Sequence, residues 1–542
     1  MGYRQAVRHR TLTPAFVGSN PTSPVFKLSK GPLAQSVEHM TFNHGVAGSI
    51  PAWLIFFMLF YDMFAVWRRL FMDLGKTNSF NLFISKHGVK LLYFLFALLI
   101  LVEGFTFSKI VPFGQTPDEI AHYEMIEEEF GTSGYVDEMT YVLWYMAGYG
   151  GLPRSEQTGV NTVAAEAVSG IKFTQSLSIT DFKPNIRILR HLPAGLGFYA
   201  GIALGLPMAS CARLAEILTV LFFVVMSLLT VWVAPVKKEV FALTMLLPTY
   251  LQQCTSINYD SVLLPCCLFL FAYILKLYYS EDKVRWGNMA LILALSLVIL
   301  VTKPPYILIL ISMFIIPLDH YELKIGSKFE LAGFVKKYIW FFVAAGVAMV
   351  AMLFYIGRNN PDIKTIMSDI FSPLDFLRLL KRTFFEYFLA HIRQVVGVFG
   401  WLDSGVSVAC VVIVLLFMVY VIVFKAEKTD LKLNVKRRLI LLLSSFGVFM
   451  LIEIALQSWT YLHLGFGRDV GVAVYKQYMR EIPHIMGIQG RYWLPCVPIT
   501  LIALSGNKER KYKWLYFAIQ FVFYVGLFIY VTALLYERYW AA

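Results

Sequence analysis

Long apolar runs alternate with short polar segments along most of the chain, from about residue 89 to its end. Uncharged stretches such as 217–236 and 404–424 reach the roughly 20 residues that an α-helix needs to cross the hydrocarbon core of a bilayer. The pattern predicts an all-α, polytopic transmembrane bundle of about eleven spans. The predicted spans cover 89–110, 212–234, 239–257, 260–279, 286–302, 304–318, 338–356, 404–424, 439–461, 491–506 and 513–535.

A further apolar segment, 193–207, is bounded by two prolines and is too short to cross a bilayer. Its 15 residues make a helix of about 22 Å. We expect this helix to lie at the membrane interface or half-buried, without spanning. Gly197, Gly201 and Gly205 are four residues apart and would form one smooth face for close packing.

Charged residues in the loops predict the orientation of the chain. Loop 425–438 has six basic and two acidic residues, and 507–513 has four basic and one acidic, whereas the long loop 112–190 has eleven Asp or Glu. The positive-inside rule places both basic loops in the cytoplasm. With eleven spans, the N-terminus is then cytoplasmic, and 112–211 is an exoplasmic loop with interfacial helices. The prediction is a multi-pass protein of the plasma (inner) membrane.

Composition narrows the class of protein. The chain is 58% hydrophobic and 15% charged, against about 25% charged residues in soluble domains. A soluble enzyme, a disordered chain and a secreted disulfide scaffold are therefore excluded. The net charge of +13 comes from basic residues in short loops, so it does not indicate a nucleic-acid partner. The six cysteines lack the paired spacing of a zinc or redox site, and we expect them to pack as small apolar residues.

Residues 1–57 differ from the remainder of the chain and repeat a short motif. Gly-Ser-Asn-Pro at 18–21 and Gly-Ser-Ile-Pro at 48–51 lie 30 residues apart. Both resemble the translated T-arm of a transfer-RNA gene, so we interpret the segment as two tandem transfer-RNA genes read through from an upstream start codon. The alternative is a disordered basic tail. On the first interpretation, 58–88 form a cytoplasmic N-terminal region before a transmembrane domain at 89–542. The candidate starts are then Met58, Met63 and Met72.

The first polar motif, Thr-Pro-Asp-Glu-Ile-Ala-His, begins at Thr116, just after the first predicted span. One interpretation is a capping box, with Thr116 as the N-cap and Glu119 at N3 of a helix that ends at Gly131. The other is catalytic, because Asp118 and Glu119 could deprotonate a hydroxyl or stabilise an oxocarbenium ion, with His122 on the same face. Capping and catalysis are compatible. Asp118 and His122 are too few ligands to predict a divalent metal, and no cofactor is expected.

Two further polar motifs lie at predicted ends of spans. Asn258 and Asp260 belong to a Ser-Ile-Asn-Tyr-Asp-Ser sequence that is typical of a polar turn, although an Asp at membrane depth is costly unless it is paired or lines a cavity. Lys303 precedes two prolines and Tyr306. It is interpreted either as a lysine that extends to the interface or as a ligand for an anionic phosphate.

The fourth motif, Gln-Gly-Arg-Tyr-Trp-Leu-Pro, begins at Gln489. Arg491 and Tyr492 open the tenth predicted span from its outer side. A boundary arginine in an aromatic belt explains this pattern, and so does a guanidinium positioned for bidentate phosphate binding.

Together, the four motifs resemble a bacterial family of polytopic membrane proteins of unknown function that is grouped with the GT-C superfamily of membrane glycosyltransferases. The resemblance covers roughly residue 86 to the C-terminus, and the order of the motifs carries it. The matching motifs are Pro117-Asp-Glu-x-x-His122, Asn258-Tyr-Asp260, Lys303-x-Pro-Tyr306 and Gln489-Gly-Arg-Tyr-x-Leu-Pro495.

The resemblance implies a GT-C-like fold whose first external loop supplies an acidic residue to the active site. Asp118 or Glu119 would be the general base or the transition-state stabiliser, and Lys303 and Arg491 would hold a lipid phosphate. Asn258 and Asp260 would shape the sugar pocket. The other candidate substrate-binding residues are His122, Tyr306, Gln489 and Tyr492.

The function expected from this resemblance is transfer of a sugar from a polyprenyl-phosphate-type donor to a cell-envelope glycan or lipid acceptor on the exoplasmic face. The expected partners are the lipid-linked sugar donor, the acceptor and membrane lipids, with no nucleic acid. One alternative is a transporter or flippase for lipid-linked glycans, and another is a non-catalytic scaffold of an envelope-synthesis complex.

Overall fold

The computed structural model describes most of the chain from residue 78 onward. Residues 1–57 and, apart from 352 and 355, the predicted span 338–356 lie outside the described residues. The described ranges are 78–112, 115–116, 118–132, 136, 181–325, 329–330, 333, 352, 355, 373–400, 402, 404–426, 429–463, 480, 484–485, 487–510 and 513–539.

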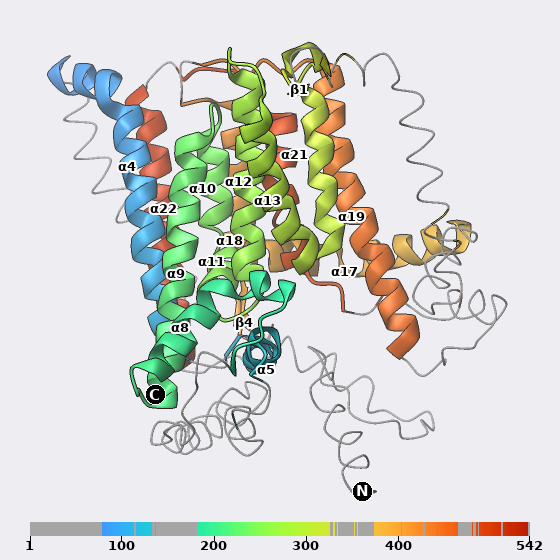
Figure 1. Cartoon of the computed structure of the whole chain (residues 1–542). Coiled ribbons are helices and arrows are strands. Elements are labelled where there is room, and N and C mark those ends of the chain that lie inside the picture. The colour runs from blue at the N-terminus through green and yellow to red at the C-terminus, as the bar shows by residue number, and fades with distance from the viewer. Residues whose placement is uncertain are drawn as a thin grey trace, which may run out of the picture.

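The described part of the chain is mainly a bundle of long helices that run side by side (Figure 1). The predicted all-α architecture is therefore confirmed. Five helices are long and apolar enough to cross a membrane. They are α4 (Asn78–Ile110), α9 (Met208–Val233), α12 (Asp260–Tyr279), α19 (Val435–His463) and α22 (Lys513–Tyr539).

Helix α12 lies at the centre of this bundle. Nearly all of its residues are buried, including Asp260 at its first position. Helix α9 packs between α4 and α12, and α22 packs along α4. An acidic residue at the start of the central helix is thereby fixed inside the protein.

Several predicted spans are shorter or divided in the structure. The segment 239–257 forms two buried helices, α10 (Lys238–Met245) and α11 (Pro248–Thr255), because Pro248 provides no backbone N–H to continue the first helix. Leu247 before it is extended, as expected for a residue that precedes proline. The break places Thr249, Gln252 and Gln253 on a short helix of their own.

A second proline break follows α13 (Trp286–Thr302). Lys303 has an extended backbone, and Pro304 begins a 3-10 helix, η3 (Pro304–Ile315), that packs back along α13. The segment 304–318 is therefore not the α-helix that was predicted. The consequence is that Lys303 lies at the turn between two packed elements.

The predicted span 491–506 is also divided. A single 3-10 turn, η6 (Gly490–Trp493), precedes a nine-residue helix, α21 (Cys496–Leu504). Helix α18 (Val408–Val423) has 16 residues and is shorter than the predicted 404–424. Among the described residues, five helices, and not eleven, are thus both long and apolar enough to span a membrane.

The short helix predicted at 193–207 is observed as α8 (Leu192–Ala203), which packs closely on α9. A Cβ atom at Gly197 would lie 2.6 Å from the Leu214 carbonyl oxygen, and one at Gly201 would lie 2.9 Å from the Cys211 Cα atom. These two glycines permit the close approach, as predicted. Gly205 does not contribute, because a Cβ there would meet nothing within 4 Å, and its φ of +67° follows the end of the helix.

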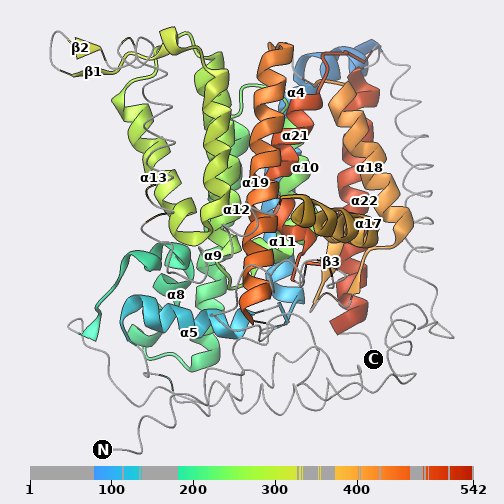
Figure 2. The same ribbon diagram turned by 90° about the vertical axis from the view of Figure 1, so that its right-hand side faces the viewer.

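Helix α17 (Pro373–Gly397) runs across the long helices and not along them (Figure 2). One of its faces is buried. Phe376, Leu379 and Thr383 are buried, whereas Leu377 and Phe384 are exposed. The exposed stripe is mainly apolar but has the exposed Lys381 in its middle, a composition typical of an amphipathic helix at an interface. Its apolar members are Leu374, Leu377, Phe384, Phe385, Phe388 and Leu389.

The predicted polar motifs and the basic loops lie at opposite ends of the bundle. Near the basic loops, the Arg438 Nη1 atom donates to the Ala503 carbonyl at 2.7 Å, and the Leu431 N–H donates to Asn507 Oδ1 at 2.7 Å. Helices α5 (Glu119–Phe130) and α8 lie at the other end, as both views show (Figures 1 and 2).

Two antiparallel β-hairpins complete the described fold. One pairs β1 (Lys324–Ile325) with β2 (Phe329–Glu330). The other pairs β3 (Val398–Phe399) with β4 (Ser404–Gly405) and links α17 to α18. The second hairpin contributes to a pocket described below.

Candidate functional site

Lys303 and Asp260 form an ion pair where α13 ends and α12 begins. The Lys303 Nζ atom lies 2.6 Å from Asp260 Oδ1. The same ammonium lies 4.6 Å from the centre of the Tyr259 ring and 4.7 Å from that of Tyr492. Two aromatic rings and a carboxylate therefore surround one largely buried cation, an arrangement in which cation–π attraction is strengthened by desolvation.

Arg491 lies on η6, beside this pair, and is itself buried. Its Nη2 atom is 3.6 Å from Asp118 Oδ2, and its Nη1 atom donates to Gln253 Oε1 at 3.0 Å. The guanidinium also lies over the Tyr492 ring, at 5.5 Å. Arg491 Nε makes no hydrogen bond with any described residue.

The structure thus brings together Asp118, Asp260, Lys303 and Arg491, which come from four separate parts of the sequence. Tyr492 connects the two ion pairs, because both cations contact its ring. Tyr306 positions this turn by donating its hydroxyl to the Tyr492 carbonyl at 2.7 Å. Two cations beside each other, each with one carboxylate, make a site that an anionic ligand can enter by exchanging with those carboxylates.

The capping box predicted for the first motif is wrong. Helix α5 begins at Glu119, and its N-cap is Asp118, which has a φ of 67° and makes no side-chain cap hydrogen bond. Thr116 Oγ1 is buried without a hydrogen-bond partner among the described residues. The left-handed conformation, which Asp tolerates better than most residues, directs Asp118 toward Arg491 instead.

Glu119 takes a different position from Asp118. Its Oε1 atom accepts a hydrogen bond from the Ile257 backbone N–H at 3.1 Å, and the side chain is buried. The carboxylate therefore fixes α5 to the turn before α12. This contact makes Asp118 the better placed of the two predicted catalytic acids.

Asn258 forms a polar turn, which was one of the two interpretations of its motif. Its Oδ1 atom accepts from the Ser261 N–H at 3.0 Å. Its Nδ2 atom donates to the Gln253 carbonyl at 2.9 Å and to Ser256 Oγ at 2.8 Å. Both amide protons are thus used to hold the turn that presents Asp260.

His122 lies between the cation site and a neighbouring histidine. Its ring is 4.6 Å from the Tyr259 ring, and its Nδ1 atom is 2.9 Å from His191 Nε2. Burial lowers the pKa of His122 well below its usual value, and so do the nearby His191 and Arg491. His191 and its partner Glu129 were not predicted from the sequence, although Glu129 is seven residues after His122 and so shares its helical face.

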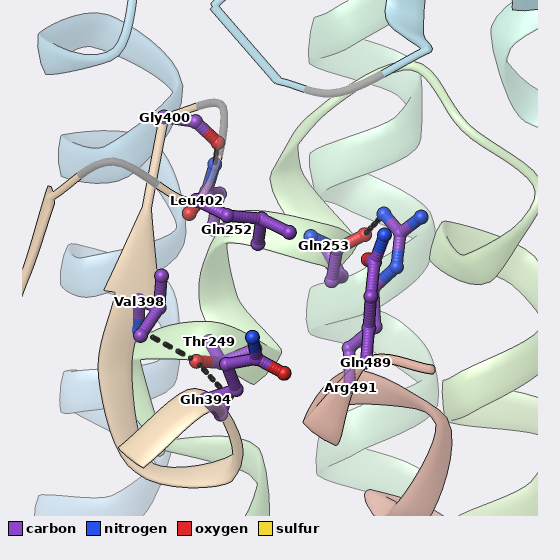
Figure 3. Close-up of a pocket in the computed structure, with 9 residues that line it drawn as sticks. All are labelled: Thr249, Gln252, Gln253, Gln394, Val398, Gly400, Leu402, Gln489 and Arg491. Atoms are coloured by element: carbon purple, nitrogen blue, oxygen red, sulfur yellow. Dashed lines mark hydrogen bonds between the residues drawn. The ribbon is translucent and has the colours of Figure 1, made fainter. Parts of the chain in front are cut away.

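A polar pocket lies on the other side of Arg491, between α11, α17 and the β3–β4 hairpin (Figure 3). It is a small pocket that is partly open to solvent. Gln489 Oε1 is buried in this region and has no hydrogen-bond partner among the described residues. The polar lining residues are Thr249, Gln252, Gln253, Gln394, Gln489 and Arg491.

Most of this lining was missed in the sequence. Gln252 and Gln253 are adjacent polar residues inside an apolar segment, and polar residues at such positions are uncommon without a role. Gln394 is held by the Gly490 N–H, which donates to its Oε1 atom at 2.7 Å. The contact between α17 and the motif that begins at Gln489 could not be predicted from the sequence and is seen only in the folded structure.

The described residues contain no group of three or more His, Cys, Asp or Glu side chains arranged to hold a metal ion. Around the two ion pairs, the donors and acceptors are instead carboxylates, amides, tyrosines and two cations. The site therefore offers charge-assisted hydrogen bonds from its cations and neutral hydrogen-bonding groups beside them.

Comparison with known proteins identifies one family. A family model described as "Predicted membrane protein (DUF2142)" matches residues 156–500. Neither a curated protein nor a solved structure gives a significant match. The matched range includes Asp260, Lys303 and Arg491, whereas Asp118 and His122 precede it. Because the match covers more than half of the 542 residues, the chain belongs to the DUF2142 family of predicted membrane proteins.

Proposed function

We propose that this protein is a membrane glycosyltransferase of the GT-C kind. It would transfer a sugar from a polyprenyl-phosphate or polyprenyl-pyrophosphate donor to a cell-envelope glycan or lipid acceptor. The observation that carries the proposal is the convergence of Lys303 and Arg491 on Tyr492, with Asp118 beside them. The family resemblance supports the same activity.

The two cations suit the phosphate of a lipid-linked donor. Lys303 and Arg491 are each paired with a single carboxylate at 2.6 and 3.6 Å. A phosphate could replace the longer of these contacts and accept hydrogen bonds from the guanidinium, whose Nε has no partner among the described residues. As the bond between sugar and phosphate breaks, the same cations would stabilise the negative charge on the leaving group.

Asp118 would act on the sugar side of that bond. Its side chain is partly exposed, whereas Glu119 is buried and hydrogen-bonded to Ile257 N–H. Once a phosphate engages Arg491, the Asp118 carboxylate is available to stabilise positive charge that develops on the sugar ring. The amide-lined pocket beyond Arg491 offers donors and acceptors for sugar hydroxyls (Figure 3).

The proposed location of the reaction is the exoplasmic face of the plasma (inner) membrane. The site lies where α12 begins and α13 ends, toward the end of the bundle that is away from the basic loops. The positive-inside rule assigns those loops to the cytoplasm. This orientation belongs to the predicted eleven-span, GT-C-like topology with a cytoplasmic N-terminus.

The alternative is a transporter or flippase for lipid-linked glycans. A transporter of lipid-linked glycans would place its site near the bilayer midplane, between repeated halves. Here Lys303 follows the last residue of α13, and Asp260 is the first residue of α12. The charges are therefore at helix ends.

The proposal is tested by comparing the envelope polysaccharide of cells that lack the gene with that of complemented cells. We expect the wild-type gene to restore the glycan and Asp118→Asn to lower its formation by roughly 10² or more. Asp282→Asn, on an exposed residue at the basic end, is the matched control and should restore it fully. Full restoration by both Asp118→Asn and Glu119→Gln, tested singly, would contradict the catalytic role of these acids.

A further inference from the structure

A buried chain of three ionisable side chains leads to the cation site. Glu129 Oε2 lies 2.8 Å from His191 Nδ1, and His191 Nε2 lies 2.9 Å from His122 Nδ1. All three side chains are 3% exposed or less. His122 and Glu129 are seven residues apart on α5, so they face the same way, and His191 bridges them from the start of α8.

The carboxylate determines the direction of these hydrogen bonds. Arg190 binds Glu129 Oε1 through Nη2 at 2.6 Å, so Glu129 is an ionised acceptor that leaves Oε2 for His191. His191 must then donate through Nδ1, and in its neutral form it accepts through Nε2. When His191 is neutral, His122 therefore donates through Nδ1, and its Nε2 atom retains a lone pair.

The second ring nitrogen of His122, Nε2, does not contact His191, because His191 binds the Nδ1 atom. Among the described residues, the hydrogen bond found for the His122 side chain is the one that its Nδ1 atom makes with His191. The ring packs edge-on against Tyr259, at 4.6 Å, and the Lys303 ammonium also contacts the Tyr259 ring, at 4.6 Å from its centre. A base held in one tautomer therefore borders the site proposed for the donor phosphate.

We infer that His122 is the catalytic base that accepts the proton of the acceptor hydroxyl, and that Glu129, acting through His191, is a positioning residue for it. This inference rests on the proposed function and deepens it by assigning the base. A buried carboxylate that orients a histidine through hydrogen bonds is an established way to fix its tautomer and to stabilise the imidazolium that forms.

The proposed step is balanced within the site. The acceptor oxygen forms a bond to the anomeric carbon while its proton passes to His122 Nε2. The bond from that carbon to the phosphate oxygen breaks, and the lipid phosphate leaves with the electron pair, held by Lys303 and Arg491. The imidazolium of His122 is stabilised through His191 by Glu129 and later releases its proton to solvent.

Donor binding would also strengthen the base. The groups that face His122 are His191 from α8, Tyr259 from α12, Lys303 after α13, Arg491 from η6 and Arg190 from η2 (Ile186–Arg190). Burial is the largest cause of its lowered pKa, and the cations add to it. A bound phosphate would neutralise Lys303 and Arg491, so the pKa of His122 should rise when the donor is present.

The tautomer can be measured directly on the full chain in lipid nanodiscs with ¹⁵N-labelled histidine side chains. His122→Gln and His191→Gln assign the two rings among the ten histidines. We expect His122 near neutral pH to be protonated at Nδ1 and bare at Nε2. With farnesyl phosphate as the probe, its titration should move to higher pH. A proton on Nε2, or an unchanged titration with the probe bound, would overturn the inference.

Adjacent glutamates provide a matched pair of variants. Glu129→Gln should let His122 populate both tautomers. The side chain of Glu128 is 65% exposed and lies 3.8 Å from Arg187. Glu128→Gln should therefore leave the tautomer of His122 unchanged. If Glu129→Gln fails to fold, the wild-type tautomer still decides the matter.

Cells report on the chemical step separately. His122→Gln should lower glycan formation by roughly 10²–10⁴-fold while the purified variant still binds farnesyl phosphate. Full activity of His122→Gln would overturn the inference while leaving the transferase proposal intact. If wild-type protein does not bind farnesyl phosphate and gene deletion does not alter the glycan, the transferase proposal fails instead, whatever the tautomer of His122.

Discussion

The ammonium of Lys303 lies 2.6 Å from the Asp260 carboxylate, and so joins the end of α13 to the start of the central helix α12. The pair is enclosed by the rings of Tyr259 and Tyr492. Two charges that are costly in a membrane protein are therefore kept together, next to a second cation, Arg491.

Removing one member of this pair should destabilise the protein. Asp260→Asn leaves the Lys303 charge largely buried without its carboxylate, and we expect a loss of roughly 3 kcal/mol in the free energy of unfolding. The double variant Asp260→Asn, Lys303→Met removes both charges and should recover most of that loss. Unfolding of the purified protein in detergent, followed by tryptophan fluorescence, measures both. An equal loss in the single and double variants would show that the pair is not coupled.

The close packing of α8 on α9 gives a second prediction. Gly197→Ala would place a Cβ 2.6 Å from the Leu214 carbonyl oxygen, so it should lower stability by about 1–3 kcal/mol. The control is Gly287→Ala in α13, where a Cβ would meet nothing within 4 Å and where Ala favours the helix by up to about 1 kcal/mol. In thermal unfolding, the melting temperature should therefore fall for Gly197→Ala and rise for Gly287→Ala, relative to the wild type. A neutral Gly197→Ala would contradict the observed packing.

Stability should fall in acid partly because of His391 on α17. Burial lowers the pKa of His391 to about 4, although a hydrogen bond with the Ile488 backbone opposes this effect. Because the unfolded chain takes up this proton near its usual pKa of about 6.5, the folded state loses stability as the pH falls from about 6.5 toward 4. Replacing His391 with Gln should flatten the difference in unfolding free energy between pH 7 and pH 5. An identical pH dependence in wild type and variant would contradict the assignment.

Local sequence patterns were informative about which residues meet at the site. Asp260, Lys303 and Arg491 are charged residues at predicted ends of apolar segments, and Asp118 is next to a second carboxylate, Glu119, shortly after the first predicted span. Charges at such positions are costly unless they are paired, which is why the pattern indicates a cluster. Their pairing partners could be read only from the fold.

The helix boundaries were less predictable, because hydrophobicity alone does not reveal how a buried segment satisfies its backbone. Pro248 divides one predicted span, and Pro304 starts a 3-10 helix in another. The partners of His122 were also hidden, since His191 is 69 residues away along the chain. Gln394 meets Gln489 and Arg491 through the packing of α17, which no local pattern encodes.

The most direct test of the account is binding of farnesyl phosphate to the purified protein in nanodiscs. We predict saturable binding that weakens at least tenfold in Arg491→Gln and weakens with rising salt, because a charge-assisted contact is lost or screened. Lys324→Gln, at the basic end of the bundle, should bind as the wild type does. Equal affinity of the wild type and Arg491→Gln would contradict the claim that Lys303 and Arg491 form a phosphate site.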